Sequence, residues 1–200
     1  MRRIPALLAV AALVLTGCGD DDSSSGTKLH GAVLDQPYVV PETTLTDTED
    51  EPYSLVTDTD RPLTLVFFGY THCPDICQTV MSSLASALTR LDDQDRERVD
   101  VVFVTTDPAR DDARALRTYL DRFDPSFIGL TGDLDTVIDI GKPLAVAVEK
   151  GDKLPSGGYE VTHSTQVTAI DDRDRVPILW TQGTPSADFA EDIHRLLERA

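Results

Sequence analysis

Two cysteines and a histidine lie close together in the segment FFGYTHCPDIC, which covers residues 67–77. Cys73 and Cys77 are four positions apart, and His72 directly precedes the first of them. Residues four apart on a helix face the same side, so the two sulfur atoms can meet at one point. Such a pair can close a disulfide, exchange with other thiols or bind a soft metal ion.

The segment follows an apolar run at residues 63–70, LTLVFFGY, which is typical of a strand buried on both faces. A second run of this kind, VDVVFVTT, covers residues 99–106. Between the two runs, apolar residues recur at helical spacing and predict a helix with one apolar face: Ile76, Val80, Leu84, Leu88 and Leu91. In such parallel units ligands bind at the carboxyl ends of the strands. We therefore expect Cys73 at that edge, and Cys77 in or just after the first turn of a helix opened by Pro74.

The start of a helix favours thiolate over thiol, and thiolate is the form that attacks disulfides and binds metals. Two thiolates and an imidazole suit copper in either oxidation state. Zinc accepts the same three ligands plus water. The type of ligand alone therefore leaves both metals open.

The rest of the chain alternates helical and strand patterns. We expect an amphipathic helix at 113–123, a short piece at 127–130 before a helix that begins near Asp133, and strands at 146–149 and 166–170. A polar turn at 171–175 leads to a strand that Pro177 predicts to be at a sheet edge. The last helix is expected to have Thr184 as N-cap and Pro185 as its first residue. This order predicts an α/β fold with a mixed sheet, compatible with a thioredoxin-like fold.

The first residues, MRRIPALLAVAALVLTGC, combine a positive start, a short apolar run and small residues before Cys18. The apolar run is too short for a membrane span, so residues 1–17 are expected to be a secretory signal. The segment resembles a bacterial lipoprotein signal, which implies lipidation of Cys18 and attachment to the extracytoplasmic face of the cell membrane. Residues 18–28 would then be the lipidated cysteine and a flexible tether, and residues 29–200 a single domain.

The chain is strongly acidic, with a formal net charge of −17, and it contains three cysteines. An acidic surface repels nucleic acid, so we expect no nucleic-acid partner. If Cys18 is lipidated, Cys73 and Cys77 are the remaining thiols. In an oxidising compartment such a pair either forms a disulfide or is kept reduced for a purpose.

The segment FFGYTHCPDIC resembles the signature of the Sco/SenC proteins, which are copper-binding, thioredoxin-fold assembly factors for cytochrome c oxidase. The segments LTDTEDEPYSL, TTDPARDD, FIGLTG and VTHSTQVTAID are similar to further parts of that family. The resemblance implies a thioredoxin-like fold, with a central mixed sheet flanked by helices and an N-terminal β-hairpin extension. It also implies that Cys73, Cys77 and His163 bind one copper ion per chain, as Cu(I), Cu(II) or both.

By this resemblance, the expected function is that of a lipid-anchored metallochaperone. It would deliver copper to the binuclear copper site of cytochrome c oxidase subunit II or to another copper protein, and would not be an enzyme in the strict sense. The competing interpretation is a thiol–disulfide oxidoreductase in which Cys73 and Cys77 form the redox pair that keeps extracytoplasmic cysteines reduced. A protein scaffold stapled by a Cys73–Cys77 disulfide is a third interpretation.

Other residues near the motif have alternative interpretations. Asp107 follows the second strand and could tune the charge of the thiols, or it could cap the turn before Pro108. His72 is expected to point elsewhere, and Met81 to be a packing residue one turn beyond Cys77. The loop EKGDKLPSGGYE, which contains glycine and proline, could carry His163 into and out of the site.

Overall fold

The computed structural model describes residues 28–59, 61–153 and 159–200. The expected signal, the Cys18 lipidation site and all but the last residue of the expected tether lie outside these ranges. Within them, no helix is long and apolar enough to cross a membrane.

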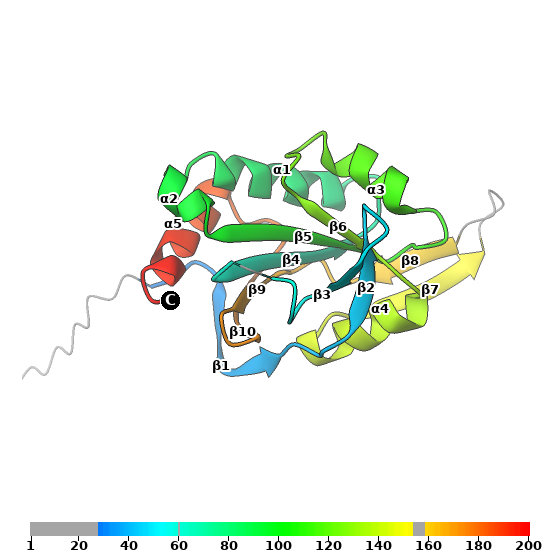
Figure 1. The fold of residues 1–200 in the computed structure, drawn as a ribbon, viewed down its shortest axis with the longest axis horizontal. Helices are drawn as coiled ribbons and strands as arrows, with labels where there is room; N and C mark the ends of the chain where they lie inside the picture. Colours follow the sequence, from blue (N-terminus) through cyan, green and yellow to red (C-terminus); the bar gives the residue numbers. More distant parts are fainter. Residues whose placement is uncertain (1–27, 60, 154–158) are drawn as a thin grey trace, which may run out of the picture.

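An eight-stranded mixed sheet forms the centre of the fold, with the strand order β1-β10-β9-β4-β5-β6-β2-β3 (Figure 1). Its parallel core consists of β4 (Leu63–Gly69), β5 (Val99–Thr105) and β6 (Ile128–Thr131). All seven residues of β4 are buried, as the apolar run predicts. The turn that carries Cys73 begins directly after this strand, at the carboxyl edge of the sheet.

Antiparallel strands extend the core on both sides. On one side lie β9 (Val167–Asp171), β10 (Arg175–Trp180) and β1 (Ala32–Val39). On the other side, β6 pairs with the hairpin of β2 (Thr44–Asp47) and β3 (Pro52–Ser54). The expected mixed sheet and N-terminal hairpin are therefore confirmed.

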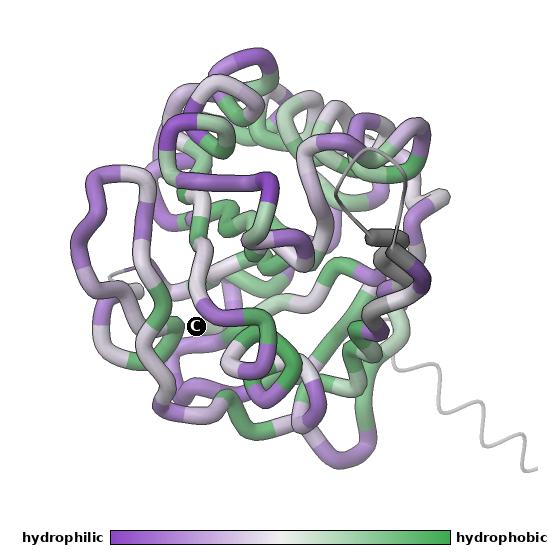
Figure 2. Tube along the Cα trace, turned by 90° about the vertical axis from the view of Figure 1, so that its right-hand side faces the viewer, coloured by the Kyte–Doolittle hydropathy of each residue, from purple (hydrophilic) through white to green (hydrophobic). Residues whose placement is uncertain are grey.

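Helices cover both faces of the sheet. One face carries α1 (Ile76–Leu88), α2 (Asp93–Arg96), α3 (Ala113–Leu120) and α5 (Ser186–Leu197), and the other carries α4 (Leu134–Gly141) with the 3-10 turn η1 (Lys142–Leu144) (Figure 1). Successive residues of β4 point to opposite faces of the sheet. Leu65 and Phe67 pack in the core layer with α1, α3 and α5, whereas Val66 and Phe68 pack in the layer with α4. Hydrophobic residues gather in the central strands and polar residues in the outer turns (Figure 2). Both cysteines belong to the core layer that contains α1.

Three expectations about local structure are wrong. Pro177 does not mark an edge, because β10 pairs with β1 on one side and with β9 on the other. The proline is tolerated because it lies where the β1–β10 register shifts, outside the paired positions of both ladders. The last helix starts one residue later than expected, with Pro185 as N-cap in an extended conformation. Pro74 does not open α1, which has Asp75 as its N-cap.

The expected loop before His163 is largely a hairpin. Strands β7 (Val148–Lys153) and β8 (Tyr159–His163) pair with each other in a separate two-stranded sheet. The hairpin lies at the end of the molecule toward which β4 and β5 point (Figure 1). Its last residue, His163, is thereby brought to the edge that carries the cysteines.

Candidate metal centre

The two cysteines lie on either side of the start of α1. Cys73 is in the turn after β4, where its amide donates to the Tyr70 carbonyl oxygen over 3.2 Å. Cys77 is the second residue of the helix, and its amide donates to the Cys73 sulfur over 3.4 Å. Both side chains are buried, with 7% of Cys73 and none of Cys77 exposed, and both thiols are free. The spacing thus brings the two sulfur atoms together without a disulfide.

The close approach of Cys77 to β4 depends on Gly69. A Cβ atom at Gly69 would lie 3.0 Å from the Cys77 sulfur and 2.9 Å from ring atoms of Phe67 and Phe103. Contacts below about 3 Å force neighbouring groups to shift. A glycine is therefore needed at the last position of the strand because the thiol packs directly over it.

Burial raises the pKa of the Cys77 thiol, and its hydrogen bond with Cys73 raises it further. The helix start was expected to favour thiolate, but for Cys77 the loss of solvation outweighs that effect. A metal ion binds thiolate, so metal binding must displace the proton of this thiol.

His163 presents a neutral imidazole. Its Nδ1 atom lies 2.9 Å from the Ser164 carbonyl oxygen, which can only accept, so Nδ1 carries the proton and the Nε2 lone pair is left for a ligand. Burial lowers the pKa of His163, which keeps the ring uncharged. Its ring stands edge-on to Tyr70, with centroids 5.7 Å apart, and to Phe67, with centroids 6.2 Å apart.

The structure brings Cys73 and Cys77 together and places His163 against the same strand end. Phe67 and Tyr70 contact the imidazole, and Gly69, between them, contacts the Cys77 sulfur. Among the described residues, however, no three His, Cys, Asp or Glu side chains are close enough to form a metal site. The donors therefore share a neighbourhood without forming a closed coordination sphere.

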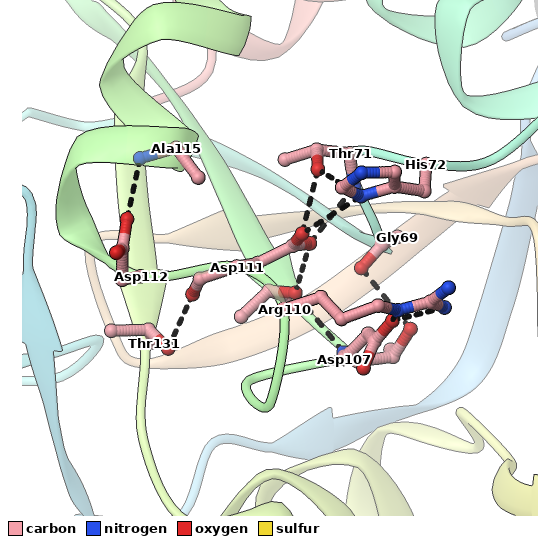
Figure 3. Close-up of polar contacts among 11 residues, drawn as sticks. Gly69, Thr71, His72, Asp107, Arg110, Asp111, Asp112, Ala115 and Thr131 are labelled. Atoms are coloured by element: carbon pink, nitrogen blue, oxygen red, sulfur yellow. Dashed lines mark hydrogen bonds and ion pairs between the residues drawn. The ribbon is translucent and has the colours of Figure 1, made fainter. Parts of the chain in front are cut away.

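His72 is engaged outside this neighbourhood, and Met81 is a buried packing residue of the core layer that also contains both cysteines. His72 is exposed and its Nδ1 lies 3.0 Å from the Thr71 hydroxyl and 3.6 Å from Asp111 (Figure 3). Met81 is fully buried in the core. Asp107 is also fully buried, where one carboxylate oxygen pairs with Arg110 and the other has no hydrogen-bond partner among the described residues. Burial raises the pKa of Asp107, against the lowering effect of Arg110.

Asp111 is the residue near the site that sequence reasoning missed. Its buried carboxylate accepts hydrogen bonds from the Thr71 amide (2.8 Å) and the Thr71 hydroxyl (2.6 Å) (Figure 3). It also accepts one from the Thr105 hydroxyl (2.7 Å). It therefore fastens the start of the cysteine turn to the end of β5. In the sequence, Asp111 belongs to the run DPARDD, which is typical of a polar turn. Nothing in that pattern indicates that one of its acidic side chains is buried.

The chain is similar to proteins of known family. The sequence model described as SCO1/SenC matches residues 33–198. A putative copper-binding protein of Stutzerimonas stutzeri is 32% identical over 170 residues, which are 85% of this chain and 82% of that protein. The chain spans less than half of the zebrafish and baker's yeast mitochondrial SCO2 proteins that it also matches.

Solved structures agree with this match. The solution structure of apo Sco1 from Thermus thermophilus has a TM-score of 0.75 and 28% identity, and the alignment covers 86% of this chain and 98% of that one. The structure of Bradyrhizobium japonicum ScoI with copper bound has a TM-score of 0.68 and 27% identity, covering 80% and 98%. The fold is thus thioredoxin-like, and the chain belongs to the SCO1/SenC family.

Proposed function

We propose that this protein is a copper carrier. It binds one copper ion through Cys73, Cys77 and His163 and hands it to the binuclear copper site of cytochrome c oxidase subunit II. The observation that carries the proposal is that two unbridged thiols and a neutral imidazole lie at the same strand end. The Nδ1 atom of that imidazole already donates to a backbone carbonyl, so its Nε2 atom is left for a ligand. Copper bound in the solved Bradyrhizobium japonicum ScoI supports the choice of metal.

The donor set fits copper chemically. Two soft sulfur atoms suit Cu(I), and an imidazole nitrogen extends the site to Cu(II). Cys73 is the more exposed of the two cysteines, so exchange with an incoming acceptor thiolate would start there. Because Cys77 is protonated when metal-free, loading releases a proton and becomes tighter as the pH rises.

The competing function is thiol–disulfide exchange, which the hydrogen bond between the two thiols favours. Exchange needs an attacking thiolate and a resolving thiol but no imidazole. The raised pKa of Cys77 makes that thiol a poor attacking group, so exchange would have to begin at the more exposed Cys73, with Cys77 as the resolving thiol.

His163→Ala separates the two functions, with His72→Ala as the control, because His72 is an exposed imidazole that faces Asp111. We expect His163→Ala to weaken copper binding by more than the roughly 10–100-fold that loss of an outer-shell partner costs. The Cys73–Cys77 redox potential should stay near that of the parent chain. If His163→Ala still restores oxidase assembly in cells that lack the parent gene, the carrier function is wrong and the exchange function replaces it.

The signal pattern supports a location for this function. We propose that the chain is anchored through lipidated Cys18 at the extracytoplasmic face of the cell membrane, where it can meet an acceptor copper protein.

A further inference from the structure

Tyr70 contacts each of the three proposed copper ligands. It is the first residue after β4 and is half-buried. Its carbonyl oxygen accepts a hydrogen bond from the Cys73 amide over 3.2 Å, its hydroxyl lies near the Cys73 side chain, and its backbone lies near the Cys77 thiol. Its ring meets the His163 imidazole nearly at right angles, with an interplanar angle of 87°.

We propose that Tyr70 is a positioning residue that holds the donors of the copper site in place before the metal arrives. The ring fixes the orientation of His163, and the hydroxyl restrains Cys73. This inference rests on the proposed copper-binding function and concerns how the metal-free site is kept ready.

The orientation of His163 is set by contacts on different sides of its ring. The Ser164 carbonyl oxygen fixes Nδ1, and the Tyr70 and Phe67 rings pack against the imidazole. Edge-to-face contacts of this kind favour one relative orientation, so the imidazole cannot turn without losing them. Phe67 is fully buried within β4 and serves as a fixed wall. Tyr70 lies just beyond the strand and adds a second ring contact to the imidazole.

The Tyr70 hydroxyl acts on the other half of the site. Cys73 lies in a turn whose backbone is held by the Tyr70 carbonyl, so the two residues already face each other. The hydroxyl, which lies near the Cys73 side chain, would then limit the rotation of that side chain. One residue therefore couples the thiol turn to the imidazole, which is otherwise carried by a separate hairpin.

Two variants separate the roles of the ring and the hydroxyl. Tyr70→Phe removes the hydroxyl and keeps the ring, whereas Tyr70→Leu removes both. Tyr119→Phe is the matched control, because the buried Tyr119 hydroxyl has no hydrogen-bond partner in the described part of the chain. A thermal melt of each variant establishes that it is folded before it is compared.

The first measurement uses metal-free protein and needs no copper. We expect a nuclear Overhauser effect between the His163 and Phe67 rings in the parent chain, in Tyr70→Phe and in Tyr119→Phe, and its loss in Tyr70→Leu. The second measurement is titration with Cu(I) and Cu(II), read by thiolate-to-copper absorbance. Affinity should fall about two- to tenfold in Tyr70→Phe, and about tenfold or more in Tyr70→Leu.

Failure of this inference can be told apart from failure of the proposed function. If the parent chain binds copper and Tyr70→Leu keeps both the ring contact and the affinity, Tyr70 positions nothing and the inference is wrong. If Tyr70→Phe loses the ring contact as completely as Tyr70→Leu, the proposed role of the ring is wrong. If the parent chain binds no copper, the carrier function fails, and the metal-free measurement still decides whether Tyr70 orients His163.

Discussion

The two halves of the candidate site rest on different kinds of structure. The thiols lie at the end of β4, which is paired with β5 and β9 along most of its length and is buried throughout. His163 is the last residue of β8, which pairs with β7 in a separate two-stranded sheet. A two-stranded hairpin is only marginally stable by itself. The imidazole therefore depends on a few local contacts, while the thiols are held by the core.

This difference predicts two kinds of response to mutation. Changes around the thiols disturb the core of the protein, so they should lower the free energy of unfolding and affect copper binding as a consequence. Changes around the imidazole should affect copper binding with little loss of stability. Substitutions in each half test whether this distinction holds.

The largest effect is expected for Asp111→Ala. The substitution leaves the Thr71 amide and two threonine hydroxyls without their buried acceptor. Each unsatisfied buried group costs about 1–3 kcal/mol, so we expect the free energy of unfolding to fall by about 3 kcal/mol or more. Urea denaturation of the metal-free protein measures the change.

The neighbouring Asp112→Ala is the control for that experiment. Asp112 is exposed, and its carboxylate accepts one hydrogen bond, from the Ala115 amide at the start of α3. Loss of such an N-cap costs about 1 kcal/mol. If Asp111→Ala costs no more than Asp112→Ala, the thiol half is not held by the core in the way described.

A smaller effect is expected for Gly69→Ala. The added methyl group would press on the Cys77 sulfur and on the rings of Phe67 and Phe103. Overpacking a tight core typically costs about 1–3 kcal/mol, and the displaced sulfur should also weaken copper binding. Gly183→Ala is the control, since a Cβ atom there meets nothing within 4 Å. Equal stability and equal copper affinity for the two variants would show that the Cys77 position is not fixed by its contact with Gly69.

The sequence predicted the thiol half better than the imidazole half. The apolar runs of β4 and β5 and the helical spacing in α1 are local patterns, and together they place Cys73 and Cys77 correctly. His163 could be joined to them only through the family resemblance, because no local pattern reports contacts between distant segments. Pro177 and Asp111 show the same limit. A register shift in the β1–β10 pairing accommodates the proline, and tertiary packing buries the carboxylate.

The smallest effect concerns the imidazole half and the pH dependence of stability in the metal-free protein. Burial lowers the pKa of His163 below its ordinary value of 6.5. As the pH falls through about 6.5, the unfolded chain takes up a proton at this residue while the folded chain does not, so stability decreases until the pH reaches the lowered pKa. The slope from one such group is at most about 1.4 kcal/mol per pH unit.

His194 provides the opposite sign within the same chain. Its hydrogen bond with Asp95 raises its pKa, so its contribution is present below pH 6.5 and is lost as the pH rises through the raised value. In urea denaturation between pH 5 and 8, His163→Gln should flatten the loss of stability below about pH 6.5, and His194→Gln should remove a gain of stability that accompanies the fall in pH toward about 6.5. If both substitutions change the profile in the same direction, the imidazole of His163 is not held neutral by burial. The contrast between a thiol half fixed by the core and a neutral imidazole fixed by local contacts would then be wrong.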